Sequence, residues 1–255
     1  MRIRDITDLL DSKFPRENAL DYDNPGLIAG DPDRTVTGCI LSLDCTSKAI
    51  EAAKKNGFNL IITHHPLIFG GFDTVTTETS TGKLLLQLIK SDIACFASHT
   101  NLDLTDEFGN LAIAEALGAD DASHLEGTVC GVVFECGEGE NVKSLAKRTA
   151  EGLGASGIIT INDPQNKVKK VFVQGGSFDE DSIPAIVAAG CDTVISGEIK
   201  HHVTVMLEEL GINSIIAGHS ATEQVYLPKI AKMLEEEFPQ IKFIVNNNNE
   251  SASVL

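Results

Sequence analysis

Short apolar runs alternate with helical patterns along most of the chain. The first fifteen residues place apolar side chains between charged ones at the spacing of an amphipathic helix. From residue 36 onward, β-branched runs that predict strands alternate with segments of helical periodicity, which is typical of βα units and a largely parallel sheet. The predicted strands are residues 36–43, 59–63, 93–98, 128–136, 170–174, 192–196 and 213–217, and the predicted helices are residues 46–57, 84–90, 108–117, 141–153, 180–189 and 199–210. The chain is therefore predicted to be an α/β protein.

No linker rich in Pro, Gly or Ser marks a domain boundary in the sequence. Its 255 residues suffice for one large domain or two lobes, and the polar loop 120–127 is the candidate crossing between lobes. We predict a discontinuous first lobe of residues 1–125 and 211–255 and a second lobe of residues 126–210. A last helix begins near residue 221, and Pro228 is expected to kink it or delay its start.

Charge and cysteine content narrow the class of protein. A formal net charge of −17 opposes the attraction of nucleic acid, so no nucleic-acid partner is predicted. No stretch approaches the roughly 20 apolar residues of a membrane span, and charged residues interrupt the N-terminus, so neither a membrane segment nor a signal peptide is expected. The six cysteines lack C-x-x-C spacing and fall mostly in apolar runs, which indicates buried thiols in a reducing compartment. We expect a cytoplasmic protein.

Polar clusters that contain histidine follow four of the predicted strands. The clusters end the runs NLIITHHP, CFASHTNLD, TVISGEIKHH and SIIAGHSATE, and they hold six of the seven histidines. In open α/β sheets, side chains beyond the carboxyl ends of separate strands can converge. The clusters therefore predict a metal site built from strand ends.

The adjacent residues His64 and His65 lie on a backbone that Pro66 keeps extended. Successive side chains of an extended chain point to opposite sides, so two adjacent imidazoles suit two neighbouring ions better than one. The alternative is one hydrogen-bonded core histidine beside one surface histidine.

Two carboxylates follow histidines at a spacing of four, Asp103 after His99 and Glu223 after His219. Such pairs can lie on one side of a turn, and a carboxylate can bridge two ions. We predict His64, His65, Asp103, His219 and Glu223 as ligands of two divalent ions, which are Zn, Mn, Fe or Co because imidazole and carboxylate donors suit these metals. As alternatives, Ser220 and Glu223 fit a capping box, and Asp103 fits a turn.

Further polar side chains exceed what two ions need. Glu198 is a candidate catalytic acid or base, His99 is a second catalytic candidate, and His201 is a candidate substrate contact. As an alternative, Glu198 favours a helix N-terminus, and His201 and His202 are surface residues. The sequence lacks a phosphate loop, a GxGxxG fingerprint and a G-x-S-x-G elbow.

The motifs together resemble one family, the GTP cyclohydrolase type 2 homologues, also called the NIF-three-like family. The resemblance rests on DYDNPGL, HHPLIF, SHTNLD, GE followed by HH, and GHSATE, in this order. It implies a two-lobed α/β fold with mixed, largely parallel sheets, a dinuclear metal site between the lobes and a homohexameric ring. It also implies that His65 and Asp103 hold one ion, that His64 and His219 hold the other, and that Glu223 bridges them. The chain is short for this family and has no room for an extra inserted domain.

The resemblance implies a metal-dependent hydrolase similar to GTP cyclohydrolase type 2, an enzyme that opens the ring of GTP and releases formate. A phosphoester hydrolase would use the same ions. We lean toward an enzyme with a small-molecule or nucleotide substrate. The rival hypothesis is a non-catalytic metal-binding scaffold or regulatory protein that acts through oligomer and partner contacts, and it gains from the absence of arginine in the histidine segments.

Overall fold

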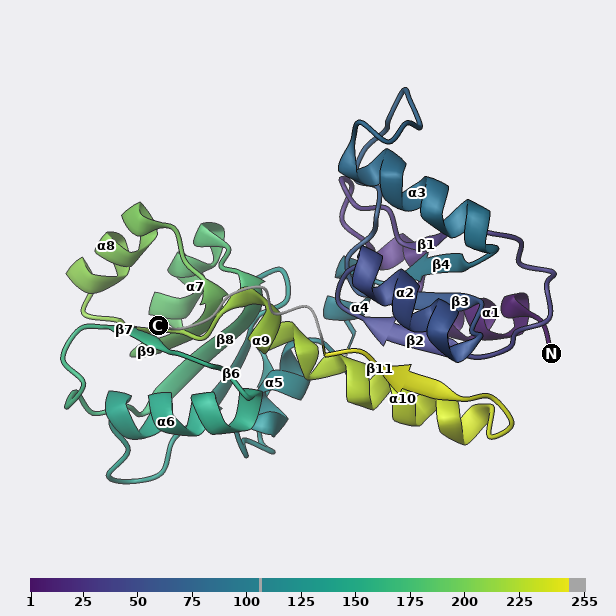
Figure 1. Cartoon of the computed structure of the whole chain (residues 1–255). Helices are drawn as coiled ribbons and strands as arrows, with labels where there is room; N and C mark the ends of the chain where they lie inside the picture. Colours follow the sequence, from purple (N-terminus) through teal and green to yellow (C-terminus); the bar gives the residue numbers. More distant parts are fainter. Residues whose placement is uncertain (106, 248–255) are drawn as a thin grey trace. The chain divides into compact units, whose positions relative to one another are not determined.

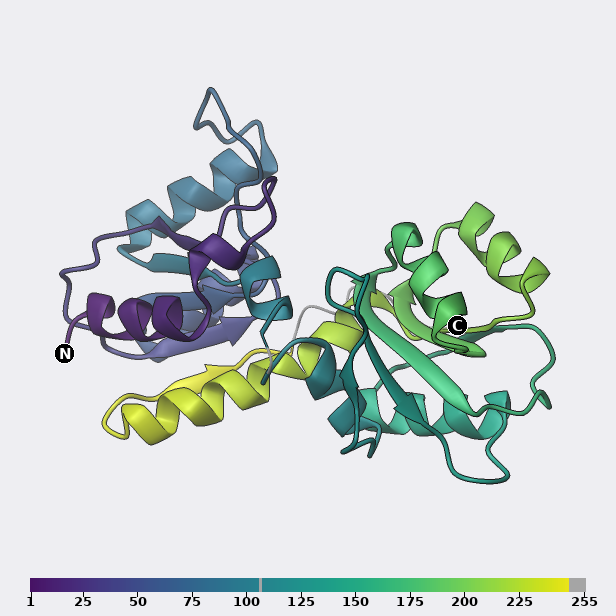
Figure 2. The same ribbon diagram turned by 180° about the vertical axis from the view of Figure 1, so that it is seen from behind.

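The structure is a computed structural model that describes residues 1–105 and 107–247, and these residues divide into two compact units (Figures 1 and 2). The first unit contains residues 1–105 and 227–247, and the second contains residues 107–226. The sequence placed the corresponding bounds at residues 125 and 211. The bounds differ because the strand that begins at Asn213 pairs with a strand of the second unit and therefore belongs to it.

The first unit contains a mixed sheet with the strand order β1-β4-β3-β2-β11. β1 is antiparallel to β4, whereas the other neighbouring pairs are parallel. The strands are β1 (Gly26–Ala29), β2 (Cys39–Ser42), β3 (Leu60–Thr63), β4 (Ala94–Ala97) and β11 (Phe243–Val245), and the helices are α1 (Ile3–Lys13), a 3-10 turn (Arg16–Asn18), α2 (Ser47–Asn56), α3 (Ser80–Ser91), α4 (Thr100–Asp103) and α10 (Tyr226–Glu237).

Helices α2 and α3 cover one face of this sheet, and α1 lies on the opposite face (Figures 1 and 2). On the face covered by α2 and α3, the hydrophobic core includes Ile50 of α2, Ile61 of β3 and Leu88 of α3. The bounds of α2 match their sequence signals, because the Thr46 side chain accepts a hydrogen bond from Ala49 N at 3.1 Å and Gly57 ends the helix at φ +70°. The predicted βα alternation is confirmed in this unit.

The second unit contains a mixed sheet with the strand order β5-β6-β8-β9-β10-β7, in which β8, β9 and β10 form its parallel pairs. Its core packs α7 and α8 against β8 and β9 through residues such as Ile186, Leu207 and Phe172. The strands are β5 (Ser123–His124), β6 (Val132–Glu135), β7 (Ile159–Ile161), β8 (Lys170–Ser177), β9 (Thr193–Glu198) and β10 (Asn213–Ile216), and the helices are α5 (Asn110–Ala116), α6 (Val142–Leu153), a 3-10 turn (Glu180–Ser182), α7 (Ile183–Ala188), α8 (His201–Glu209) and α9 (His219–Gln224).

The last predicted helix is two helices in the structure. α9 ends at Gln224, and α10 begins at Tyr226, two residues before Pro228. Proline is tolerated in the first turn of a helix, where its missing N–H has no intrahelical partner, so Pro228 delays the start of α10 rather than kinking one long helix. None of the helices in the described part of the chain has the length and apolar character needed to cross a bilayer.

Candidate metal centre

Polar side chains of the first unit gather at the carboxyl edge of its sheet. β2, β3 and β4 are parallel neighbours, so their carboxyl ends lie at the same edge. Asp44 follows β2, His64 and His65 follow β3, and His99 follows β4. The strand-end convergence predicted from the sequence is therefore present within this unit.

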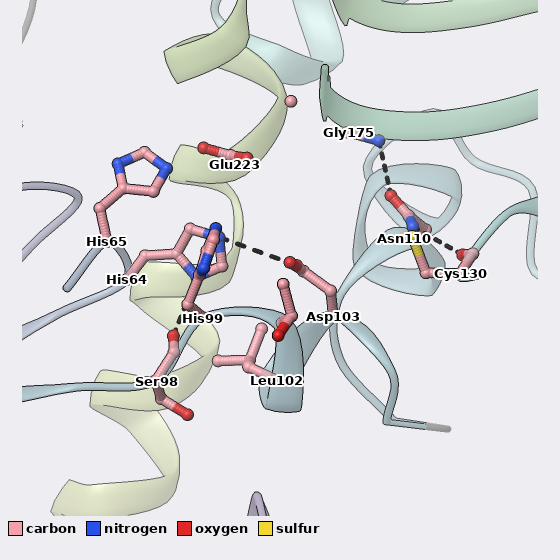
Figure 3. A network of polar contacts seen from close by, with 12 residues as sticks. His64, His65, Ser98, His99, Leu102, Asp103, Asn110, Cys130, Gly175 and Glu223 are labelled. Carbon is pink, nitrogen blue, oxygen red and sulfur yellow. Dashed lines mark hydrogen bonds and ion pairs between the residues drawn. The ribbon is translucent and has the colours of Figure 1, made fainter. Parts of the chain in front are cut away.

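The three imidazoles of this edge form a cluster (Figure 3). One ligand atom each of His64, His65 and His99 lies within 4.8 Å of the other two. Their ring centroids are 5.0 to 5.4 Å apart, and the rings are tilted or edge-on rather than stacked. His64 is 2% exposed, so this cluster is not a set of surface histidines. Such a group of donors could hold a metal ion.

The Nδ1 atom of each imidazole in this cluster faces an oxygen that can only accept a hydrogen bond. Nδ1 of His64 lies 3.0 Å from the Ser98 carbonyl, and Nδ1 of His65 lies 2.8 Å from Asp44 Oδ1. Nδ1 of His99 lies 3.0 Å from Asp23 Oδ1. Each Nδ1 therefore carries a hydrogen, which leaves Nε2 as the nitrogen that could bind a metal. This orientation by an outer oxygen is the usual arrangement around histidine ligands of metals.

In addition to Asp44, the carboxylates of Asp103 and Asp23 lie next to these imidazoles. Asp103 is the last residue of α4, and its Oδ1 lies 3.7 Å from His64 Nε2 (Figure 3). Burial alone would raise the pKa of Asp23, but hydrogen bonds from His99 and Thr100 outweigh it and hold the pKa of that carboxyl below its usual range. Asp23 is therefore ionised, and it stabilises the Nδ1–H form of His99.

Polar side chains of the second unit also gather at the carboxyl edge of parallel strands. Glu198 ends β9, and His219 begins α9 directly after β10. Nδ1 of His219 lies 3.2 Å from Glu198 Oε1, and Nε2 of His219 lies 3.2 Å from Glu223 Oε2. Both ring nitrogens of His219 thus face a carboxylate, and the side chain of Glu223 is 6% exposed.

The capping-box alternative for Glu223 is wrong. Gly218, at φ +94°, is the N-cap of α9, so Ser220 lies inside the helix and cannot cap it. Glu223 is a buried residue on the same helix as His219. The position of its carboxylate is therefore not explained by a helix cap, and a ligand role for Glu223 stays a prediction.

Two glycines make room for α9 and for the Glu223 carboxylate. A Cβ at Gly176 would lie 2.4 Å from Glu223 Oε1, and a Cβ at Gly197 would lie 2.8 Å from the Cα of His219. Gly176 has φ +60° and lies at an irregularity of β8, where the register to β9 shifts between Gln174 and Ser177. Gly197 is therefore required for steric reasons because backbone atoms lie close to it, and Gly176 is favoured by its positive φ.

Side-chain hydrogen bonds fix the bulge in β8 from two sides. The N–H of Gly176 donates to Thr222 Oγ1 at 3.0 Å, and Thr222 in turn donates to the His219 carbonyl at 2.7 Å. The N–H of Gly175 donates to Asn110 Oδ1 at 2.6 Å, and Asn110 Nδ2 donates to the Cys130 carbonyl at 2.6 Å (Figure 3). The position of Glu223 relative to β8 is therefore set by buried polar contacts.

The remaining histidines lie apart from this arrangement within the second unit. His201 and His202 begin α8 and are exposed, and His202 Nε2 pairs with Glu180 Oε2 at 2.7 Å. His124 is exposed on β5. His201 and His202 are therefore surface residues, as the alternative interpretation predicted. A substrate contact by His201 stays a prediction.

The donors of both units fit a transition-metal centre. Imidazole nitrogen and carboxylate oxygen without thiolate suit Zn, Mn, Fe or Co. The histidine Nε2 atoms are oriented by outer oxygens, and Gly176 leaves the space that the Glu223 carboxylate occupies. The donors within each unit are therefore of the kind that could hold a metal ion.

Glu198 is expected to act on His219, because its Oε1 faces His219 Nδ1. Glu198→Ala should weaken the binding of the ion at His219 by roughly 10–100-fold, the usual cost of losing an outer partner of a histidine ligand. The measurement is Co²⁺ titration followed by absorbance. Glu180→Ala is the matched control, because Glu180 holds an exposed histidine at α8 instead. Equal affinity in Glu198→Ala would leave Glu198 with only the catalytic role predicted from the sequence.

The sequence pattern did not predict a role in the site for Asp23, Asp44, Gly176 or Thr222. Asp44 was predictable in principle, because it follows the end of β2 in the same way as His64 and His65 follow the end of β3. Asp23 lies in the DYDNPGL motif, but its distance in sequence from His99 concealed their contact. The roles of Gly176 and Thr222 depend on the bulge in β8, which alternation of apolar residues does not reveal.

Curated proteins resemble this chain over nearly its whole length. It is 30% identical over 253 residues to a protein of Clostridium perfringens named GTP cyclohydrolase 1 type 2 homolog, and the match covers 96% of each chain. A protein of Streptomyces coelicolor with the same name is 33% identical over 246 residues, which cover 92% of this chain and 86% of that protein.

Solved structures share the fold. A hypothetical protein of Staphylococcus aureus matches with a TM-score of 0.91 and 26% identity over 100% of this chain and 99% of that one. A Bacillus cereus protein related to NIF3 matches with a TM-score of 0.93 and 20% identity over the same shares, which supports the fold alone. A family profile described as Duf34/NIF3 (NGG1p interacting factor 3) matches residues 1–251. With the α/β fold and the histidine segments in place, the chain belongs to the Duf34/NIF3 family.

Proposed function

We propose that the protein is a metal-dependent hydrolase that binds two divalent transition-metal ions through His64, His65, Asp103, His219 and Glu223. The observation that carries this proposal is the orientation of the histidines. His64 and His65 each direct Nδ1 toward an accepting oxygen, which orients Nε2 as the potential ligand atom. His219 faces a carboxylate with each ring nitrogen, Glu198 with Nδ1 and Glu223 with Nε2.

The five ligands divide between two ions as the family resemblance implies. His65 and Asp103 would hold one ion, His64 and His219 would hold the other, and Glu223 would be shared between them. Support for the bridge comes from the two oxygens of Glu223, since Oε2 lies 3.2 Å from His219 Nε2 and Oε1 fills the space beside Gly176.

When bound, a pair of divalent ions lowers the pKa of a bound water and polarises the bond that it attacks. Glu198 contributes by holding His219, and its carboxylate is 61% exposed, so it is also accessible to substrate. His201 is proposed as a substrate contact from its place at the start of α8. These assignments follow from strand-end position and exposure.

The proposed substrates are nucleotides or other phosphoesters, with the ring opening of GTP as the first reaction to test. The naming of relatives as GTP cyclohydrolase 1 type 2 homologs supports this choice. The test incubates Zn-, Mn- and Co-loaded protein with GTP, other nucleotides and phosphodiesters, and measures formate and phosphate release. Turnover should disappear with chelator and return with metal.

The same experiment separates the enzyme from a non-catalytic scaffold. Arginine is absent from the segments that carry the histidines, so a triphosphate would lack bidentate partners there. Protein that binds two ions per chain but turns over none of the panel would support the scaffold. A homohexameric ring and a cytoplasmic location stay predictions, and light scattering should find six times the mass of one chain.

A further inference from the structure

Phe69 places an aromatic ring at the surface beside the histidine cluster of the first unit. The rings of Phe69 and His99 meet edge-on, with centroids 5.6 Å apart and planes at 84°. An edge-on contact covers at most one face of the Phe69 ring, which agrees with the 50% exposure of this residue. A flat apolar face therefore remains accessible next to the imidazoles.

The backbone is attached to the first unit directly before Phe69. This residue lies in the loop of residues 64–79 between β3 and α3 (Figure 1). Leu67 packs against the hydrophobic core under α2 and α3, and the Ile68 carbonyl accepts a hydrogen bond from Asn24 Nδ2 at 3.0 Å. These contacts limit where the Phe69 ring can lie.

Further exposed apolar side chains lie on this loop and on residues 17–29, the segment that contains Asn24. Tyr22 belongs to that segment, Phe72 and Val75 belong to the loop, and all three are exposed. Single exposed apolar residues are common on protein surfaces, whereas several on adjoining segments beside a polar cluster are typical of a ligand-binding surface. The two segments therefore offer apolar contact to a ligand.

Both segments are acidic. They contain no Lys or Arg, and their carboxylates are those of Glu17, Asp21, Asp23, Asp73 and Glu78. Proteins bind phosphate groups largely through cationic side chains, so a phosphate would find no such partner on these segments and would be repelled by their carboxylates. An uncharged aromatic ring experiences no such repulsion. The surface around Phe69 therefore suits the ring of a ligand rather than its phosphates.

We propose that Phe69 is a substrate-binding residue that stacks on a planar, uncharged heteroaromatic ring, such as the base of a nucleoside. The inference rests on the proposed function and deepens it, because it names the part of the substrate that lies at the first unit. Every base has a flat π-face, and its stacking on an aromatic side chain needs no charged partner. Among the proposed substrates, this role of Phe69 favours those that contain a base over phosphoesters without one.

The experiment measures the binding of guanosine and of ribose 5-phosphate to the full chain reconstituted with Zn, by isothermal titration calorimetry. The wild type should bind guanosine more tightly than ribose 5-phosphate. Phe69→Ala should raise the dissociation constant for guanosine by roughly 5–150-fold, the range that stacking of one base on an aromatic side chain contributes. The Zn content should remain that of the wild type, because Phe69 supplies no metal ligand.

Two further variants at this position separate stacking from apolar contact in general. Phe69→Tyr keeps the ring and should retain the affinity for guanosine, whereas Phe69→Leu keeps apolar volume without a flat face and should lose affinity as Phe69→Ala does. Ile89→Ala is the matched control, because Ile89 is an exposed apolar residue on α3 of the same unit. Thermal unfolding checks that each variant is folded.

Three results would refute the stacking role. They are a wild type that binds no guanosine, tighter binding of ribose 5-phosphate than of guanosine, and a change of less than about twofold in Phe69→Ala, which is below the range for base stacking. A loss in Phe69→Ala that Phe69→Leu restores would replace stacking with apolar contact and refute it as well.

These outcomes are separable from those of the proposed function. Metal-dependent turnover of the substrate panel, without an effect of Phe69→Ala on guanosine binding, would refute the stacking role and leave the hydrolase intact. Guanosine binding that Phe69→Ala weakens, in a protein that turns over none of the panel, would refute the hydrolase and leave the ring-binding role of Phe69 intact.

Discussion

Glu223→Gln is expected to remove both metal ions from the protein. Glutamine has the shape of glutamate but is a poor bridging ligand, so both ions would lose the carboxylate that they are proposed to share. The fold should persist, because the new amide can donate to His219 Nε2 where the carboxylate faced it at 3.2 Å. Elemental analysis after reconstitution with Zn or Mn gives the stoichiometry.

Thermal unfolding provides a second readout for Glu223→Gln. The metal-free variant should unfold at the temperature of the metal-free wild type or above it. The stability that the ions add should vanish, which amounts to about 2.7 kcal/mol for each ion at a free metal concentration of 100 times its dissociation constant. Glu209→Gln, an exposed substitution at the end of α8, is the control. Two retained ions in Glu223→Gln would remove Glu223 from the ligand set.

Gly176→Ala should weaken metal binding by at least roughly tenfold without unfolding the protein. The new Cβ would lie 2.4 Å from Glu223 Oε1, which is the far end of a flexible side chain, so the carboxylate moves instead of the backbone. The positive φ adds a strain of roughly 1–2 kcal/mol that any L side chain experiences. Metal affinity should therefore fall more than strain alone explains.

Gly190→Ala separates the strain from the displaced carboxylate. Gly190 has φ +70°, close to the +60° of Gly176, but nothing lies within 4 Å of its Cβ position. Chemical unfolding should show a similar strain in both variants, whereas isothermal titration with Zn²⁺ should show weakened binding only in Gly176→Ala. If Gly190→Ala weakens binding equally, the space beside Glu223 does not matter.

The βα alternation was predictable because buried parallel strands are continuous apolar runs that contrast with amphipathic helices. It located β2, β3, β4, β9 and β10, and with them the strand-end histidines. The short edge strands β7 and β11 lacked this contrast and were missed. Their pairing depends on neighbours that only the tertiary structure supplies.

Part of the candidate site could be predicted for the same reason. His64, His65 and His219 lie where strands end, so their convergence within each unit follows from parallel pairing. The contact between Asp23 and His99 joins a loop before β1 to the residue after β4, and no local pattern encodes it. The role of Gly176 depends on a distance to a carboxylate, which the sequence does not contain.

The parallel pairing of β2 with β11 has a consequence for the order in which the protein is made. The described residues of the second unit are contiguous in sequence, so all of them have been synthesised once the ribosome passes Tyr226. The first sheet still lacks β11 at that moment, and one edge of β2 remains without its strand partner. Such an edge is open to pairing with other nascent chains. The unit that begins at the N-terminus is therefore the last to be completed during translation.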